Sequence, residues 1–168
     1  MTLNRMGAIF LSTFLVLGLA SCAHRPTSPV TSEHLFAYGT YKHQVQVDVI
    51  TPPRKMEMRG VVAYTPTQLK VVGLSPFGTT LFRIEENLTT GEVKKEFYMD
   101  AIQKHETQFL QFYSMIRAMV TGPSQRTEFT QDGADFVVSE PDVRGVYRKI
   151  NVKHSRFNLE VRVTDYEI

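Results

Sequence analysis

Residues 156–164 read RFNLEVRVT, a run in which apolar and polar side chains alternate without interruption. Alternation with a period of two is typical of a β-strand with one buried and one exposed face. Val45, Val47 and Val49 repeat the pattern near the start of the chain. With turn residues between the segments, this criterion predicts about nine strands. The first ends before Thr51, and the others span residues 55–65, 68–75, 79–86, 93–99, 126–130, 134–139, 145–153 and 156–164.

One segment departs from this alternation. Between residues 106 and 121 the apolar side chains follow the i, i+3, i+4, i+7 spacing of an amphipathic helix, and Gly122-Pro123 ends it. Because one helix cannot cover a flat sheet of nine strands, we expect the sheet to curl around it. The predicted fold is mainly β with one long helix: a curved antiparallel sheet, or open half-barrel, with the amphipathic helix in its mouth.

The N-terminus carries a different signal. Residues 8–19 are largely apolar, and the small residues Ala20 and Ser21 precede Cys22, the single cysteine of the chain. A run of about 12 apolar residues is shorter than the roughly 20 that span a bilayer. The pattern resembles the bacterial lipobox, which implies that Cys22 is acylated and becomes the mature N-terminus. An ordinary cleaved signal and an uncleaved N-terminal helix are the alternatives, and Met6 is a possible start in place of Met1.

These features divide the chain into three parts. We expect a lipoprotein signal peptide over residues 1–21, a lipid-anchored tether over 22–38, and one folded domain over 39–168, which begins between His34 and Tyr41. Removing the first 21 of the 168 residues leaves 147, enough for one core. The net charge of +2 is not gathered into a basic stripe, so nucleic acid is not an expected partner.

Motifs of catalysis are missing from the sequence. The five histidines form no HxH or HExxH pair, and no GxSxG or glycine-rich phosphate loop occurs. We therefore expect no enzyme, no metal and no cofactor beyond covalent acyl chains on Cys22. Glu85 and Glu86 are adjacent on a predicted strand and point to opposite faces, which we interpret as ordinary surface residues.

The segment Ser75-Pro76-Phe77-Gly78 joins two apolar strands. Pro76 fixes φ and Gly78 permits a positive φ, so a tight turn is expected with Phe77 at its tip. Two interpretations stay open: Phe77 folds back under the rim of the sheet, or it projects as a loop that contacts a membrane or ligand. An exposed Phe forgoes about 1.5–3 kcal/mol of burial, so exposure would call for a functional reason.

Together with the lipobox, residues 74–78 (LSPFG) running into 80–84 (TLFRI) resemble the LolA/LolB superfamily, the periplasmic carrier and outer-membrane receptor of bacterial lipoproteins. The resemblance covers most of residues 41–168 as a pattern. It implies a lipid-binding half-barrel and a membrane-contact loop formed by Pro76, Phe77 and Gly78. The chain departs from the receptor in lacking tryptophan. An uncharacterised lipoprotein family of the same fold is the alternative.

The first functional hypothesis is a lipid-anchored envelope protein that binds acyl chains of lipids or lipoproteins in a concave apolar cavity and aids their insertion into the outer membrane. The expected lining residues are Phe82, Ile84, Phe97, Phe109, Phe112 and Ile116. The expected location is the bacterial envelope, with the protein anchored at the outer membrane and facing the periplasm. The second hypothesis is a non-catalytic structural or assembly accessory that binds an envelope protein partner.

Overall fold

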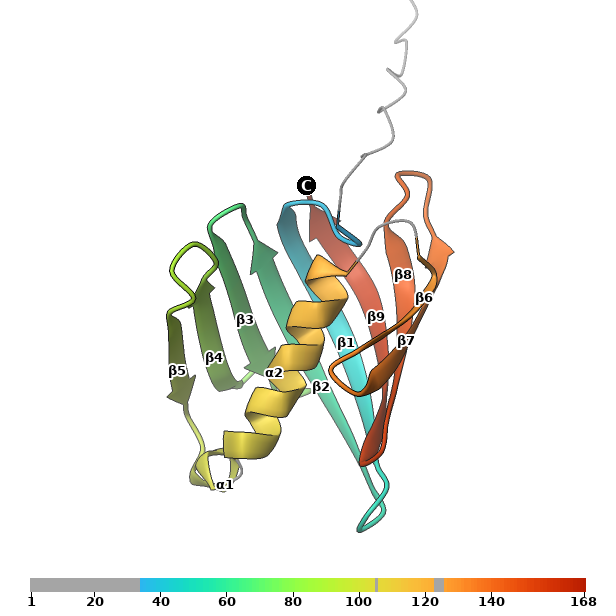
Figure 1. Cartoon of the computed structure of the whole chain (residues 1–168). Coiled ribbons are helices and arrows are strands. Elements are labelled where there is room, and N and C mark those ends of the chain that lie inside the picture. The colour runs from blue at the N-terminus through green and yellow to red at the C-terminus, as the bar shows by residue number, and fades with distance from the viewer. Residues whose placement is uncertain (1–33, 105, 123–125) are drawn as a thin grey trace, which may run out of the picture.

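The computed structural model describes residues 34–104, 106–122 and 126–168. Nine antiparallel strands form one sheet in the order β5-β4-β3-β2-β1-β9-β8-β7-β6 (Figure 1). The strands are β1 (Gly39–Val49), β2 (Arg54–Tyr64), β3 (Gln68–Leu74), β4 (Thr80–Asn87), β5 (Val93–Phe97), β6 (Glu128–Gln131), β7 (Ala134–Pro141), β8 (Tyr147–His154) and β9 (Phe157–Glu167). The helices are α1 (Asp100–Gln103) and α2 (Glu106–Thr121).

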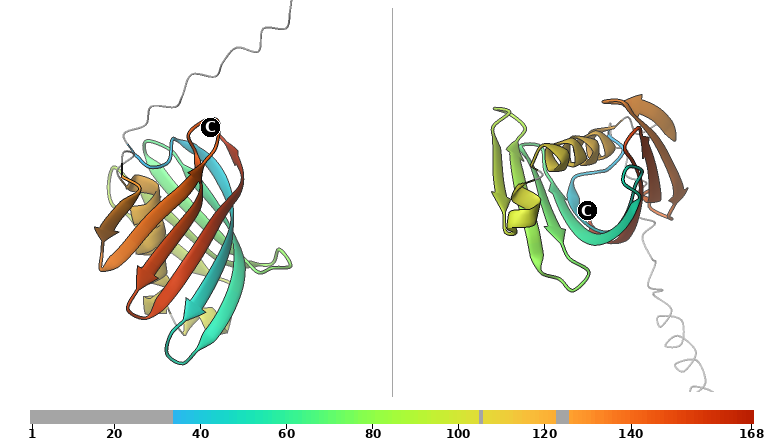
Figure 2. Two further views of the ribbon diagram at one scale, coloured as in Figure 1. Left: turned by 90° about the vertical axis from the view of Figure 1, so that its right-hand side faces the viewer. Right: turned by 90° about the horizontal axis from the view of Figure 1, so that it is seen from below.

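The sheet curves around α2, and the predicted fold class is confirmed. Seen along the strands, the sheet bends round one side of the helix, which lies in the open mouth (Figure 2). The sheet is not closed into a barrel, because β5 and β6 stand at the two ends of the strand order. The predicted helix has the bounds that the structure gives α2.

Two features differ from the prediction. The short helix α1 was not expected, since its four residues are too few to show a helical period. The packed region also begins before the domain boundary at residue 39, although within the expected range from His34 to Tyr41. Leu35 and Phe36 are buried in the core, and the Leu35 backbone N–H donates to the Gly122 carbonyl over 2.6 Å. The last part of the expected tether therefore packs as part of the domain.

Burial follows the alternation. On β1, Tyr41, His43, Val45 and Val47 are buried, while Lys42, Gln44 and Gln46 between them are more exposed. β9 repeats this with Leu159, Val161 and Val163. α2 covers the concave face with Phe112, Met115 and Met119, which are also buried. The apolar face of one curved sheet and the apolar stripe of one helix thus make a single core.

A buried carboxylate ties α2 to the sheet. Glu86 on β4 is 6% exposed, so the expectation that it is a surface residue is wrong. Arg117 Nε donates to both carboxylate oxygens, at 3.1 and 2.9 Å, and the Tyr113 hydroxyl donates to Oε2. Burial, together with that bond, raises the pKa of Tyr113. An unpaired carboxylate would be costly here, and the two helix side chains offset that cost. Glu85, as expected, faces outward and pairs with Lys70 at 2.7 Å.

Two glycines shape the concave face. Gly60 and Gly73 are neighbours across β2 and β3, flanked by His43 on β1 and Phe82 on β4. A Cβ placed on Gly73 would lie 2.1 Å from Cε1 of Phe82, so the phenyl ring fills the space that a side chain would need. At Gly60 the nearest atom, Cβ of His43, is 3.8 Å away. Gly73 is required by packing, and Gly60 is not.

This contrast predicts opposite effects of the same substitution. Gly73→Ala should lower the free energy of unfolding by about 1–3 kcal/mol, because the buried Phe82 must shift. Gly60→Ala should leave it unchanged or raise it by about 0.4–1 kcal/mol, because the unfolded chain loses freedom. Urea denaturation measures both. If the contact with Phe82 is the cause, the loss of stability in the double variant Gly73→Ala/Phe82→Leu should be smaller than the sum of the losses in the two single variants. Equal effects at the two glycines would contradict this account.

Candidate functional site

An apolar cavity of about 350 Å³ lies between the first half of α2 and the adjoining ends of β1, β2 and β9. Its wall is apolar, and its rim carries Thr51, Gln111, Ser155 and Arg156. The wall consists of Val47, Val49, Met56, Met58, Phe109, Phe112 and Phe157. Its volume and its apolar lining are those of a small-molecule site.

Local structure explains why these side chains converge. Val47 and Val49 are two residues apart on β1 and therefore share the concave face, as do Met56 and Met58 on β2. Phe109 and Phe112 are three residues apart and share one face of α2. Phe109 packs against Phe82 at 5.4 Å and Phe97 at 6.2 Å between ring centroids. The first half of the helix thus packs against β4 and β5. The space on the opposite side of the helix, next to the ends of β1, β2 and β9, stays open.

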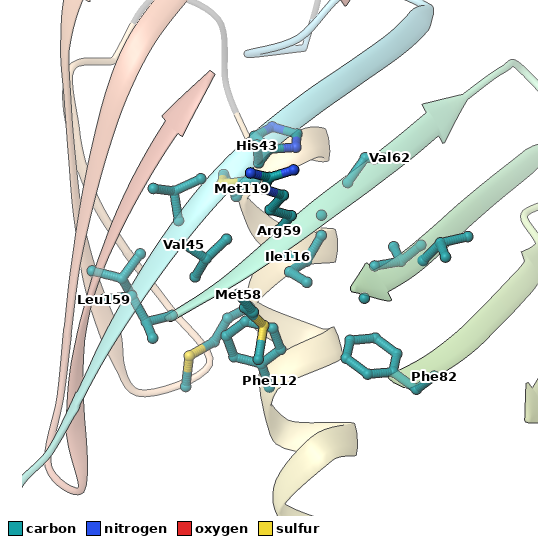
Figure 3. Close-up of a pocket in the computed structure, with 17 residues that line it drawn as sticks. His43, Val45, Met58, Arg59, Val62, Phe82, Phe112, Ile116, Met119 and Leu159 are labelled. Atoms are coloured by element: carbon teal, nitrogen blue, oxygen red, sulfur yellow. The ribbon is translucent and has the colours of Figure 1, made fainter. Parts of the chain in front are cut away.

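A second, smaller cavity of about 30 Å³ lies further along the concave face. Figure 3 shows His43 and Met119 at one end of its lining and Met58 and Phe112 at the other. Met58 and Phe112 line both cavities and form the partition between them. The smaller cavity has room for about one water molecule.

His43 lines the smaller cavity, which we call the inner cavity, and is a buried polar residue. It is 4% exposed, and neither ring nitrogen has a hydrogen-bond partner among the described residues. Its neighbours include the rings of Phe36 and Tyr41, with centroids 6.4 and 6.3 Å away. Burial lowers the pKa of His43 to about 4, so the ring is neutral at pH 7.

The structure brings together some of the lining residues expected from sequence. Phe109 and Phe112 line the larger cavity, and Phe82, Phe112 and Ile116 line the smaller one. Ile84 and Phe97 border neither cavity. Ile84 is fully buried in the core, and Phe97 is half-buried beside Phe109.

Sequence reasoning missed most of the wall of the larger cavity. Val47, Val49 and Phe157 were assigned to the apolar faces of their strands but not to a cavity, and Met56 and Met58 were not singled out. The alternation was the signal that marked this face. It could not show which part of the face α2 leaves uncovered, since that depends on the contacts of the helix with β4 and β5.

The loop between β3 and β4 has the expected tight turn. The Gly78 N–H donates to the Ser75 carbonyl over 2.9 Å, and Gly78 has a φ of +89°. The Phe77 side chain is 96% exposed, which excludes the interpretation that it folds under the rim. The loop leaves the sheet on the convex side, away from α2 (Figure 2).

A groove of about 620 Å³ runs on the convex side beside this loop. It is bordered by Pro76 and Leu74 and by side chains of both charges, including Lys42, Glu57 and Arg59. An exposed aromatic residue therefore lies beside a groove of mixed apolar and charged character.

Three further observations concern possible chemistry and attachment. In residues 34–104, 106–122 and 126–168, no group of three or more His, Cys, Asp or Glu side chains is placed to hold a metal ion. Within the same ranges, no helix has both the length and the apolar character needed to cross a bilayer. Cys22, the expected lipidation site, lies outside the described residues.

Comparison with known proteins returned no match to a family model or to a curated protein.

The buried, unpaired His43 predicts a pH-dependent stability. The unfolded ring binds a proton near pH 6.5 and the folded ring only near pH 4. The free energy of unfolding should therefore not depend on His43 above about pH 6.5. Between pH 6.5 and pH 4 it should fall by about 3 kcal/mol as the pH drops, because the unfolded ring takes up a proton that the folded ring does not. Urea unfolding of the wild type and of His43→Leu across this range tests it. Both proteins contain the carboxylates, so the difference between them isolates His43. Parallel curves would contradict the prediction.

Proposed function

We propose that this protein binds acyl chains of lipids in the larger cavity, beside the first half of α2. The observation that carries the proposal is the 350 Å³ apolar cavity in the open side of the half-barrel, walled by valine, methionine and phenylalanine. Binding there needs no directional contact along the chain, because burying each methylene contributes about 0.8 kcal/mol. Methionine side chains adapt to flexible apolar guests, and two of them form one side of the wall.

In this proposal the protein is an envelope lipoprotein held at a membrane by acyl chains on Cys22. Two or more chains are needed for stable attachment, because one chain binds only marginally. The lipobox-like sequence and the resemblance of residues 74–84 to the LolA/LolB superfamily support this placement, with the outer membrane as the expected site. The exposed Phe77 supplies an apolar contact by which the domain touches the bilayer.

A cavity-filling substitution tests the binding site. Val49→Trp places a large side chain in the cavity, whereas Asn158→Trp adds the same side chain at an exposed position one register step away on β9. Displacing two methylenes of a ligand should cost about 1.6 kcal/mol, so fatty-acid affinity should fall at least about tenfold for Val49→Trp. Asn158→Trp should bind as the wild type does.

The measurement is titration of a fluorescent fatty acid into a protein that begins at His34, which retains all nine strands and α2. Circular dichroism checks that each variant is folded, and native mass spectrometry detects co-purified lipid. A folded wild type with no saturable binding and no bound lipid would refute the proposal.

Phe77 has its own prediction. Phe77→Glu should weaken co-flotation with phospholipid vesicles by about tenfold or more, because a charged side chain cannot enter the bilayer. The free energy of unfolding should change by less than about 0.5 kcal/mol, since the side chain has almost no protein contacts. Val143→Glu is the matched control, because Val143 is fully exposed in the β7–β8 loop at the opposite end of the sheet (Figure 1). Equal losses for both variants would argue against a specific role of Phe77.

A structural or assembly accessory is the second candidate function. The convex groove beside Phe77 favours it, because an exposed aromatic residue next to groups of both charges is typical of a protein interface. In that case Phe77→Glu should abolish capture of an envelope partner, while binding of the fluorescent fatty acid stays unchanged.

A further inference from the structure

Arg156 distinguishes the rim of the larger cavity from its wall. It lies in the turn between β8 and β9 and is the one charged residue among the eleven that border the cavity. Its backbone is fixed at both ends, because its N–H donates to Nδ1 of His154 at 3.3 Å and its carbonyl accepts from Ile50 N–H at 2.9 Å. The turn therefore holds the arginine at the entrance of the cavity.

The guanidinium of Arg156 has no ion-pair or hydrogen-bond partner within the described part of the chain. Asp48 lies on β1, which pairs with β9, but its Oδ1 is 4.0 Å from Nζ of Lys55 and makes no ion pair with Arg156. Arg117 pairs with Glu86, Arg148 with Asp142 and Arg162 with Glu160, whereas Arg54, Arg59 and Arg126 resemble Arg156 in having no ion pair within the described residues but do not border this cavity. No carboxylate borders the cavity to neutralise Arg156. Hydroxyl and amide groups of Ser155, Thr51 and Gln111 share its rim.

We infer that the cavity selects a single acyl chain with an anionic head group. The chain would occupy the apolar wall, while Arg156 and the neighbouring polar side chains bind the carboxylate or phosphate at the entrance. An arginine presents several N–H donors in a fork that matches both kinds of anion. This inference rests on the proposed function and adds to it the charge of the ligand and the number of its chains.

The volume sets the number of chains. A methylene takes up roughly the 30 Å³ of a water molecule, so 350 Å³ accommodates one chain of roughly a dozen carbons. A second chain of the same length would need about twice this volume. The ligand that fits the site as it stands is a monoacyl amphiphile.

The test compares head groups on one chain length. The full chain is reconstituted in phosphatidylcholine vesicles, and a neutral photoreactive dodecanol is cross-linked to it. Laurate, dodecyl phosphate, dodecanol and dodecyltrimethylammonium then compete for the site at about pH 9, where the carboxylic acid is ionised. Mass spectrometry locates and quantifies the cross-link. For the wild type, laurate and dodecyl phosphate should compete at concentrations about threefold to tenfold lower than dodecanol, and the cationic amphiphile should compete least.

Arg156→Gln should remove this preference and leave the neutral probe bound as before. Lys153→Gln is the matched control. It removes a positive charge three residues away, on the exposed face of β8, and should preserve the preference for anionic head groups. A preference confined to dodecyl phosphate would identify phosphate as the head group. Equal competition by laurate, dodecyl phosphate and dodecanol in the wild type, or an unchanged preference in Arg156→Gln, would overturn the inference. Failure of the neutral probe to label the cavity at all would instead overturn the proposed function.

Discussion

The pairing of Glu86 with Arg117 and Tyr113 fixes where the single long helix lies across the sheet. One helix cannot cover the concave face of nine strands, so its position decides which part of that face stays open. The buried carboxylate holds the middle and end of α2 to β4. Phe109 packs against Phe82 and Phe97 and keeps the first half of the helix on the same side. The ends of β1, β2 and β9 are left without a helix over them, and the larger cavity lies there.

The sequence specifies the elements of this fold better than it specifies the site. A period of two marks the central strands such as β1 and β9, and the change to a period of 3.6 marks α2, because burial of one face imposes both patterns. Contacts between residues that are far apart in the sequence leave no such periodic pattern. Glu86 looks like any strand carboxylate until Arg117 and Tyr113 are brought to it from residues about thirty positions later. Likewise Ile84 and Val47 are equivalent by alternation and both are buried, and only the placement of α2 makes Val47 border a cavity while Ile84 does not.

The two cavities are related through the residues between them. Met58 and Phe112 border both, and a methionine side chain changes rotamer at little cost. A chain longer than the outer cavity would push against this partition and, on passing it, would reach the unpaired ring of His43. The neutral imidazole of His43 is already buried without a hydrogen-bond partner among the described residues, which costs stability. An apolar ligand beside it would therefore bury no further polar group. Under the proposed function, the smaller cavity is the direction in which a longer acyl chain would extend.

The cavity entrance and the Phe77 loop lie at the same end of the strands, although on opposite faces of the sheet (Figures 1 and 2). The described chain begins at the other end, where His34 lies against Tyr64 and Leu35 bonds to Gly122. An anchor at Cys22 does not force that end toward the membrane. Cys22 precedes His34 by twelve residue steps, which span at most about 40 Å, more than the roughly 36 Å length of β1. A lipidated Cys22 therefore allows the end that carries Phe77 and Arg156 to face the bilayer, where an acyl chain has the shortest path into the cavity.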